Sequence, residues 1–409
     1  MRKYNGISRG RLGPYYYVNL TKPEYIEQVF LNPDIYVKGR DNKTLRFILG
    51  NGLVTSEGEF WLKQRRLIQP LFHKKRLQGF VEKMVESTQT MLQTWEGKTG
   101  RIVDLHTEMT NVTLAIVSQT LMSTEVKGDF EKVSDALVVI MEGMMNFFRL
   151  PDWIPTPGNL RMRSNRKVLY NTIHKIIEER RHSKEQFDDL LTMLMEVEDA
   201  DTRERMTDEQ LRDEVITIFL AGHETTANAM SYAFYLLAQH RHIKQRLVEE
   251  VNSVIGAEEI TFENLSRLTY TTMVIKEVMR LYPPVWGITR DAAQDTVIDG
   301  YLIKKGDSIA MSPYAVQRSD RYWENPLKFD PERFSPEKVK DIHRYAWFPF
   351  GGGQRFCIGN NFAMMEMQII LALACRAYNF TLAENFELKL ETLVTLRPKS
   401  GIMVKLAKC

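Results

Sequence analysis

The feature that most restricts the fold of this chain is a helical pattern that occupies more than half of its 409 residues. From about Ser56 to Ala292, apolar side chains recur every three or four positions with few glycines or prolines between them, which is typical of packed helices. The clearest interruption is LPDWIPTPG at residues 150–158, where three prolines within seven positions exclude a helix. Inside the pattern, one long helix is predicted from about Asp208 to His240.

Short strands are predicted near the two ends of the chain. A turn at residues 11–14 leads into the strand-like Tyr15–Val18, and a helix is expected from Pro23 with Thr21 as its cap. The remaining predicted elements follow Pro283–Pro284 and are strands at 297–303, 307–311, 392–396 and 402–406 and a last helix at about 360–378. We therefore expect a mainly α fold of the α+β type, in a single domain over residues 1–409 because no linker divides the chain.

Composition is that of an ordinary globular protein, with 44% hydrophobic and 26% charged residues. A net charge of +3 argues against a nucleic-acid-binding protein. No apolar run approaches the roughly 18–20 residues that span a bilayer, and the first residues lack the apolar stretch of a signal peptide. The three cysteines, Cys357, Cys375 and Cys409, form no CxxC pair, which is typical of a reducing compartment. A cytoplasmic protein without a transmembrane segment is expected.

The most informative segment is FGGGQRFCIG at residues 350–359. Its three glycines would let the backbone approach a bulky flat group. Cys357 comes just before a predicted helix, where free N–H groups and the helix dipole favour a thiolate, and a thiolate is a good ligand for haem iron. A phosphate-binding loop is disfavoured because no Lys-Ser/Thr follows the glycines. On the residues alone, a buried structural cysteine is an equal alternative.

The spacing of this segment resembles a family signature. Phe350, Gly353, Arg355, Cys357 and Gly359 match the FxxGxRxCxG pattern of the cytochrome P450 family at every fixed position. Similar signatures occur in the family's order along the chain: WLKQR at 61–65, AGHETT at 221–226, EVMR at 277–280 and PERF at 331–334. The chain is identified on these motifs as a member of that family. The resemblance implies the cytochrome P450 fold, with a b-type haem between the central helix and the Cys357 loop.

Glu277 and Arg280 are three positions apart and share one face of a helix. The resemblance implies that both meet Arg333 in a buried network that fixes the cysteine loop, and the surplus positive charge must then find backbone carbonyls. The alternative is a solvated helical ion pair, which contributes only about 0.3–0.5 kcal/mol.

Trp61 and Arg65 are four positions apart, and their side chains can only donate hydrogen bonds, which suits an anion. By resemblance this anion is a haem propionate. Arg290 and Arg355 are the other residues that the resemblance assigns to the two propionates. The alternative for each arginine is an ordinary surface position.

Gly222 costs up to about 1 kcal/mol relative to alanine inside a helix, which indicates that another group approaches the backbone closely. The resemblance places O₂ at this point of the central helix, with Thr225 as its hydrogen-bond donor and Glu224 in a proton relay from solvent. The alternatives are a hydroxyl bonded to its own helix and a solvated carboxylate. His223 is expected to be a packing residue and not an iron ligand.

Residues 61–79 contain six basic side chains and no acidic one. By resemblance this region lies on the thiolate side of the haem, where it would steer an acidic electron donor of the ferredoxin or flavodoxin type. A solvated basic face is the alternative. The resemblance also implies that the substrate pocket is lined by apolar residues, namely Leu53, Val54, the connection from Phe147–Phe148 to Ile154, Val285–Trp286 and Leu393–Val394. An apolar small molecule such as a fatty acid, terpenoid or steroid is predicted, although these residues could be ordinary core.

Most relatives carry a first helix or a membrane anchor before the first strand, whereas here Met1 falls almost on the strand-like segment, so the family's N-terminal helix is expected to be missing. No reductase is appended after Cys357, so electrons from NAD(P)H are expected through a separate protein. The predicted function is insertion of one oxygen atom from O₂ into an apolar substrate. The alternatives are a peroxide-using haem-thiolate enzyme and a non-catalytic haem-binding sensor or carrier. The Glu224–Thr225 pair favours the monooxygenase.

Overall fold

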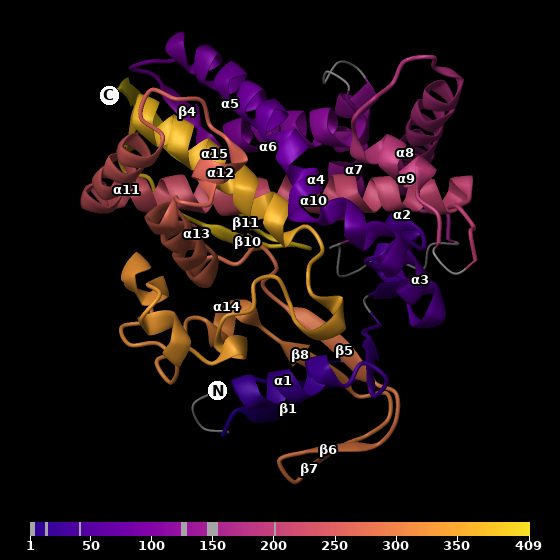
Figure 1. The fold of residues 1–409 in the computed structure, drawn as a ribbon. Coiled ribbons are helices and arrows are strands. Elements are labelled where there is room, and N and C mark those ends of the chain that lie inside the picture. Colours follow the sequence, from indigo (N-terminus) through magenta and orange to yellow (C-terminus); the bar gives the residue numbers. More distant parts are fainter. Residues whose placement is uncertain (1–4, 13–14, 41, 124–128, 145–153, 200–201) are drawn as a thin grey trace.

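The computed structural model describes residues 5–409 except 13–14, 41, 124–128, 145–153 and 200–201. Helices occupy the upper part of the molecule in Figure 1, and the largest sheet lies below them. The helices are α1 (Pro23–Leu31), α2 (Asn42–Leu49), α3 (Gly58–Ile68), α4 (Lys74–Leu77), α5 (Val81–Glu96), α6 (Leu105–Met122), α7 (Asp129–Met144), α8 (Pro157–His182), α9 (Leu190–Glu196), α10 (Asp208–Gln239), α11 (Arg241–Val254), α12 (Phe262–Leu265), α13 (Thr269–Leu281), α14 (Pro313–Val316) and α15 (Asn360–Ala377).

Short 3₁₀ helices connect several of these elements: η1 (Gln69–Phe72), η2 (Gln78–Phe80), η3 (Pro331–Phe334), η4 (Lys338–Asp341), η5 (Arg344–Ala346) and η6 (Gly353–Arg355). The strands are β1 (Ile7–Leu12), β2 (Tyr15–Leu20), β3 (Tyr36–Lys38), β4 (Ile102–Asp104), β5 (Ile288–Ala292), β6 (Thr296–Ile298), β7 (Tyr301–Ile303), β8 (Ser308–Met311), β9 (Tyr378–Leu382), β10 (Leu390–Thr392), β11 (Leu396–Pro398) and β12 (Met403–Lys408). The predicted mainly α fold with a small β portion is confirmed.

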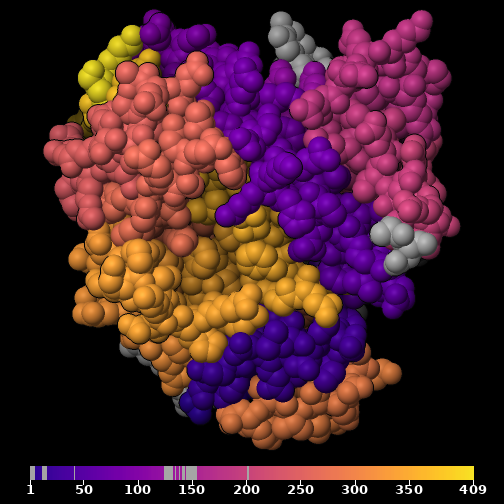
Figure 2. All heavy atoms as spheres, in the orientation of Figure 1, coloured from indigo at the N-terminus to yellow at the C-terminus, as the bar shows by residue number. Residues whose placement is uncertain are grey.

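The strands join parts of the chain that are far apart in sequence. The largest sheet has the order β1-β2-β8-β5-β3, and its pairs are antiparallel except for the parallel pair β2–β8. A second sheet has the order β4-β12-β9, and the hairpins β6–β7 and β10–β11 complete the set. Figure 2 shows on one face how the indigo N-terminal segment lies directly against the orange segments that follow residue 290.

The central helix is α10, and it extends over 32 residues without a break. Its start is defined by a capping box, because the Thr207 side chain accepts from the backbone of Gln210 and the Gln210 side chain accepts from the backbone of Thr207. The helix packs against α6, α13 and α15. The prediction of a helix from about Asp208 to His240 is therefore confirmed.

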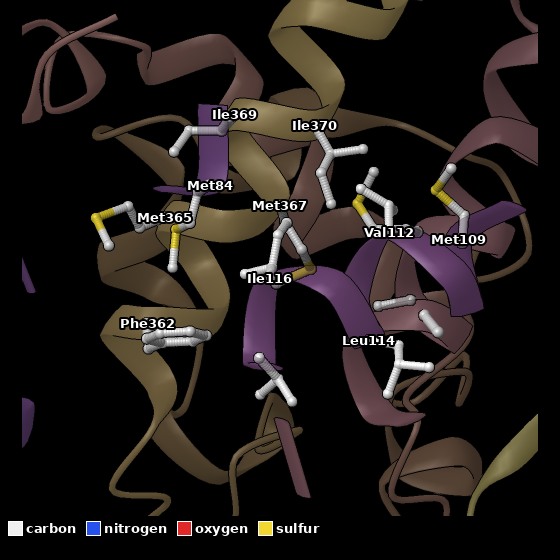
Figure 3. Close-up of a cluster of buried hydrophobic side chains, with 14 of the residues drawn as sticks. Met84, Met109, Val112, Leu114, Ile116, Phe362, Met365, Met367, Ile369 and Ile370 are labelled. Carbon is white, nitrogen blue, oxygen red and sulfur yellow. The ribbon is translucent and has the colours of Figure 1, made fainter. Parts of the chain in front are cut away.

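The main apolar core lies between these helices. In Figure 3, α15 contributes Phe362, Met365, Met367, Ile369 and Ile370, whose side chains pack against α5 and α6. A second, smaller core lies under the largest sheet and is closed by α1. Together the two cores hold the middle of α10 and the start of α15 on either side of the site described below.

Three local predictions are wrong in detail. The N-cap of α1 is Lys22, and the Thr21 hydroxyl instead donates to the carbonyl of Gly6, at 3.3 Å. Pro157 and Gly158 belong to the first turn of α8, where proline loses no helical hydrogen bond; residues 150–153 of that segment lie outside the described residues. The segment 392–396 is the turn of the β10–β11 hairpin and not one strand.

Candidate active site

The loop that carries Cys357 connects η6 to α15. Its backbone closes on itself, because the Cys357 N–H donates to the carbonyl of Phe350 at 3.0 Å. The sulfur is open to an interior cavity of about 430 Å³. The helix α15 begins three residues later, at Asn360, with Gly359 as its N-cap. The predicted position of the cysteine, just ahead of a helix, is confirmed.

The three glycines of this loop serve the packing of the loop as well as the cavity. Gly351 has a φ of +73°, a conformation that few other residues adopt. A side chain on Gly353 would lie 2.1 Å from the carbonyl oxygen of Phe30, and one on Gly352 would meet Tyr345 and Phe30. The glycines were expected to let the backbone approach a flat group; Gly352 and Gly353 are in addition required by close contacts with Phe30 and Tyr345.

Burial is the largest influence on the Cys357 thiol and raises its pKa. A hydrogen bond from the backbone of Gly359 and the charge of Arg65 act in the opposite direction. The backbone N–H at the helix start acts in the predicted direction, but desolvation of the charged form outweighs it and the charge of Arg65. A cation at the sulfur would reverse this balance, as metal coordination deprotonates a thiol.

The opposite part of the same cavity is formed by α10, through Ala221, Gly222 and Thr225. A side chain on Gly222 would come within 2.8 Å of Val117 on α6, so this glycine permits a close crossing of the two helices. The Thr225 hydroxyl donates to the carbonyl of Ala221 at 2.6 Å. This is the helix-bonded hydroxyl that the sequence left open as an alternative, although the side chain also lines the cavity.

Glu224 is held by a residue that the motifs did not indicate. The hydroxyl of Thr395, at the tip of the β10–β11 hairpin, donates to Oε1 of Glu224 at 2.7 Å, and the amide of Asn228 donates to Thr395 at 3.0 Å. Burial raises the pKa of Glu224, whereas Thr395 and Arg397 act to lower it. Glu224 is therefore a partly buried, hydrogen-bonded carboxyl and not a solvated one. No fixed spacing in the sequence connects residue 224 with residue 395.

The His223 side chain does not line the cavity. Its ring is buried and stacks on Phe219, with the ring centroids 6.1 Å apart. Burial lowers its pKa to about 4, so it is a neutral packing residue as predicted.

Three arginines converge on the cavity, namely Arg65, Arg290 and Arg355, together with Trp61. The Arg355 guanidinium lies 3.8 Å from the centre of the Trp61 ring and donates to the carbonyl of Ser56 at 2.9 Å. Burial, followed by the charges of Arg290 and Arg65, lowers the pKa of Arg355 to about 10. Three cations that repel one another form a site that an anion would stabilise.

The ionic network behind the cysteine loop has the predicted members. Arg280 donates twice to Glu277, and Arg333 lies 3.4 Å from the same carboxylate. The surplus charge is met by carbonyls, since Arg280 donates to Gln317, Pro326 and Lys328 and Arg333 donates to Asn325. Glu277 also accepts the backbone N–H of Asp330 at 2.9 Å. The network thus fixes the segment from Gln317 to η3, whereas it was expected to fix the cysteine loop itself; the solvated ion pair is excluded, because Glu277 and Arg280 are fully buried.

The rest of the cavity is largely apolar. Leu53, Val54 and Val285 line it as predicted, joined by Leu45 and Ile218. Trp286, Leu393 and Val394 are not part of its lining; Trp286 Nε1 instead donates to the carbonyl of Leu393 at 2.9 Å and ties the hairpin to the cavity wall. Ile154 does not line the cavity either, and residues 147–153 lie outside the described residues.

The basic residues of the segment 61–79 include ones that are paired with acidic residues and ones that are exposed. Lys63 pairs with Glu204, and Arg66 lies 3.9 Å from Asp199, so these charges are partly compensated. The three basic residues of α4, Lys74, Lys75 and Arg76, are exposed side by side.

These residues fit a haem. The cavity between the cysteine loop and α10 would hold the macrocycle. The thiol of Cys357 would bind the iron, and the converging guanidinium groups would bind the two propionates. A cysteine and a threonine-bearing helix on opposite sides of one apolar cavity form the arrangement expected of a haem-thiolate protein.

Comparisons with known proteins agree with this class. A sequence model described as cytochrome P450 matches residues 1–406. The chain is 33% identical over 367 residues to cyclooctat-9-en-7-ol 5-monooxygenase of Streptomyces melanosporofaciens, covering 88% of this chain and 80% of that protein. It is 33% identical over 391 residues to pentalenene oxygenase of Streptomyces avermitilis, covering 94% and 86%. The crystal structure of the cytochrome P450DA heme domain superposes with a TM-score of 0.92 at 26% identity, covering 99% of this chain and 90% of that one.

The chain belongs to the cytochrome P450 family. It is accordingly an oxidoreductase that incorporates oxygen, and haem is the cofactor of its family and fold. Among the described residues, no helix is long and apolar enough to cross a membrane.

Proposed function

We propose that this protein is a monooxygenase that transfers one oxygen atom from O₂ to an apolar small molecule, with electrons delivered from NAD(P)H by a separate protein. The observation that carries the proposal is that Cys357 and Thr225 line one cavity whose remaining walls are mostly apolar. The names of two relatives, which specify oxidation of cyclooctat-9-en-7-ol and of pentalenene, support a cyclic hydrocarbon-like substrate over a charged one.

In this proposal Cys357 would hold the iron of a b-type haem, and Trp61, Arg65, Arg290 and Arg355 would hold its propionates. The haem supplies the activation of O₂, and a thiolate ligand promotes cleavage of the O–O bond. The apolar walls from Leu45, Val54 and Ile218 exclude water and orient the substrate.

The proton required by this chemistry is assigned to α10. Thr225 holds a proton at Oγ1, which donates to its own helix and would rotate toward the cavity to act. Glu224, the adjacent carboxyl, would take a proton from solvent and pass it inward. A peroxide-using enzyme or a haem carrier has little need of such a pair.

The electron donor is proposed to be an acidic protein of the ferredoxin or flavodoxin type. The exposed cluster Lys74–Arg76 on α4 supports this, because complementary charges raise encounter rates. We further propose that residues 1–409 form one domain, which is supported by strand pairings between segments about three hundred residues apart, β2 with β8 and β4 with β12. A cytoplasmic location stays a prediction.

The proposal is tested with the purified holoprotein, a ferredoxin system, NAD(P)H and ¹⁸O₂. We expect cyclic hydrocarbons that shift the ferric haem spectrum to be converted to products carrying one ¹⁸O atom. Turnover with hydrogen peroxide but not with O₂ and the ferredoxin system would instead establish the peroxide-using enzyme.

A further inference from the structure

The carboxyl of Glu224 is connected to the C-terminal hairpin by a hydrogen-bond chain with a defined direction. An amide N–H can only donate, so Asn228 donates to the Thr395 oxygen at 3.0 Å, and the Thr395 proton is thereby directed to Glu224 at 2.7 Å. Thr395 and Asn228 are both buried, at 4% and 0% exposure. Water therefore does not readily replace either contact, and one rotamer of Glu224 is selected.

The same hairpin is attached to the wall of the cavity. The backbone N–H of Leu396 donates to the carbonyl of Pro284 at 2.8 Å, and Trp286 donates to the carbonyl of Leu393 at 2.9 Å. Pro284 lines the cavity, and so does Val285, which lies between the two attachment points Pro284 and Trp286. A ligand that contacts Val285 thus acts on the segment Pro284–Trp286. This segment is hydrogen-bonded to Leu393 and Leu396, on either side of Thr395.

Two titratable side chains, Arg397 and His106, also influence this region. Arg397 on β11 favours the ionised form of Glu224 and is itself paired with Glu391 at 2.8 Å. His106 on α6 feels the charge of Arg397 and, because it is buried, has a lowered pKa. The hydrogen bond from Thr395 fixes the orientation of the Glu224 carboxyl, and the charge of Arg397 favours its ionised form.

We propose that Thr395 is a positioning residue for the oxygenation reaction, which holds Glu224 in its working orientation and connects it to the Pro284–Trp286 wall, so that occupation of the cavity is transmitted to the acid. This proposal rests on the proton-relay role given to Glu224 above. Thr395 lies outside every motif that identifies the family, and its role depends on a contact between segments 171 residues apart.

The test uses Thr395→Val, which keeps the shape and removes the hydroxyl, and Thr395→Ser, which restores it. Thr392→Val is the matched control, because Thr392 lies on the same hairpin and is exposed. In the haem-loaded protein, the carboxyl C=O infrared band that disappears in Glu224→Gln is titrated with and without a ligand in the cavity. A hydrogen bond to the charged form lowers a pKa, so its loss raises the pKa.

We expect Thr395→Val to raise the pKa of Glu224 by about one, a tenfold change in proton affinity, and to abolish the effect of the ligand on the band. Thr395→Ser and Thr392→Val should behave as the parent protein does. An unchanged band in Thr395→Val would overturn the proposal. A changed band with an unchanged ratio of peroxide released to NAD(P)H consumed would support the positioning of Glu224 and overturn its role as the relay. A lowered melting temperature of Thr395→Val together with an unchanged band would reduce Thr395 to a structural residue.

Discussion

Arg280 contacts Glu277 through two hydrogen bonds, 2.6 Å from Nε and 2.8 Å from Nη2, and neither side chain has any exposed surface. Desolvation opposes the charged form of this carboxyl and raises its pKa, while the two arginines and the Asp330 backbone stabilise that form. A buried pair of this kind adds little net stability by itself, but removing one partner leaves the other charge without compensation.

Replacement of Glu277 by alanine should therefore cost about 3–5 kcal/mol, a large part of the stability of a typical domain. We expect a low yield of haem-loaded protein and a clearly lower melting temperature. Glu198→Ala is the control, because Glu198 pairs with Arg205 on the surface and should change stability by less than about 1 kcal/mol. A soluble Glu277→Ala protein with a near-normal melting temperature would show that the network does not stabilise the fold.

Replacement of Cys357 by histidine tests the iron ligand. We expect the variant to bind haem but to lose the strongly red-shifted absorption of the ferrous carbon monoxide complex, because that shift requires a thiolate opposite the gas. Cys409→Ser is the control: Cys409 is the exposed last residue, and its variant should keep the shift. If Cys357→His kept the shift, Cys375 or Cys409 would have to be the ligand.

Replacement of Thr225 by alanine tests the proton donor. Alanine is a better helix former, so loss of the bond to Ala221 should leave folding and haem content unchanged. We expect near-normal NAD(P)H consumption with about tenfold less oxidised product, equal to about 1.4 kcal/mol, and correspondingly more peroxide. Thr225→Ser should retain most of the product. An unchanged ratio of peroxide to NAD(P)H in Thr225→Ala would make this threonine a helix residue only.

A fourth prediction concerns Glu214 on α10, which is fully buried and accepts the backbone N–H of Leu53 at 3.0 Å. Burial raises the pKa of Glu214 from 4.5 to about 8. Between these two values the folded protein binds more protons than the unfolded one, so stability must fall as the pH rises from about 4.5 to 8.

Glutamine cannot ionise but can still accept from Leu53. We expect the free energy of unfolding of Glu214→Gln to depend less on pH between 4.5 and 8. At pH 8.5 it should exceed that of the parent protein by a few kcal/mol, since one pKa unit equals about 1.4 kcal/mol. Glu209→Gln, on an exposed turn of the same helix, is the control. The measurement is the melting temperature of each protein from pH 5 to 8.5. Parallel curves for Glu214→Gln and the parent protein would show that Glu214 does not cause the pH dependence.

Local signals in the sequence were sufficient for much of the fold. Helix α10 was predicted to within one residue because its apolar residues recur every three or four positions, and Pro23 marked the start of α1. The cap itself was misplaced, because Thr21 is closer in space to Gly6 than to the helix end. Residues 392–396 read as a strand because they are β-branched and apolar, whereas Thr395 turns inward to meet Glu224.

The site could be predicted where fixed spacing connects residues on one element or loop. The pair Glu277 and Arg280 and the position of Cys357 are of this kind. The contacts that required the structure are those between remote segments: Thr395 with Glu224, Glu214 with Leu53, and Gly222 with Val117. No periodicity encodes such distances, because they depend on how the helices cross.

The parallel pairing of β2 with β8 sets an order of events during synthesis. Residues 17–20 pair with 308–311, so the partner strand is made nearly three hundred residues later. At about 5–20 residues per second this interval lasts roughly 15–60 s. Throughout it the β1–β2 hairpin has an unpaired edge, which is a template for association with other chains. On a translating ribosome, this hairpin is the part of the largest sheet that must be shielded longest before the chain can close on itself.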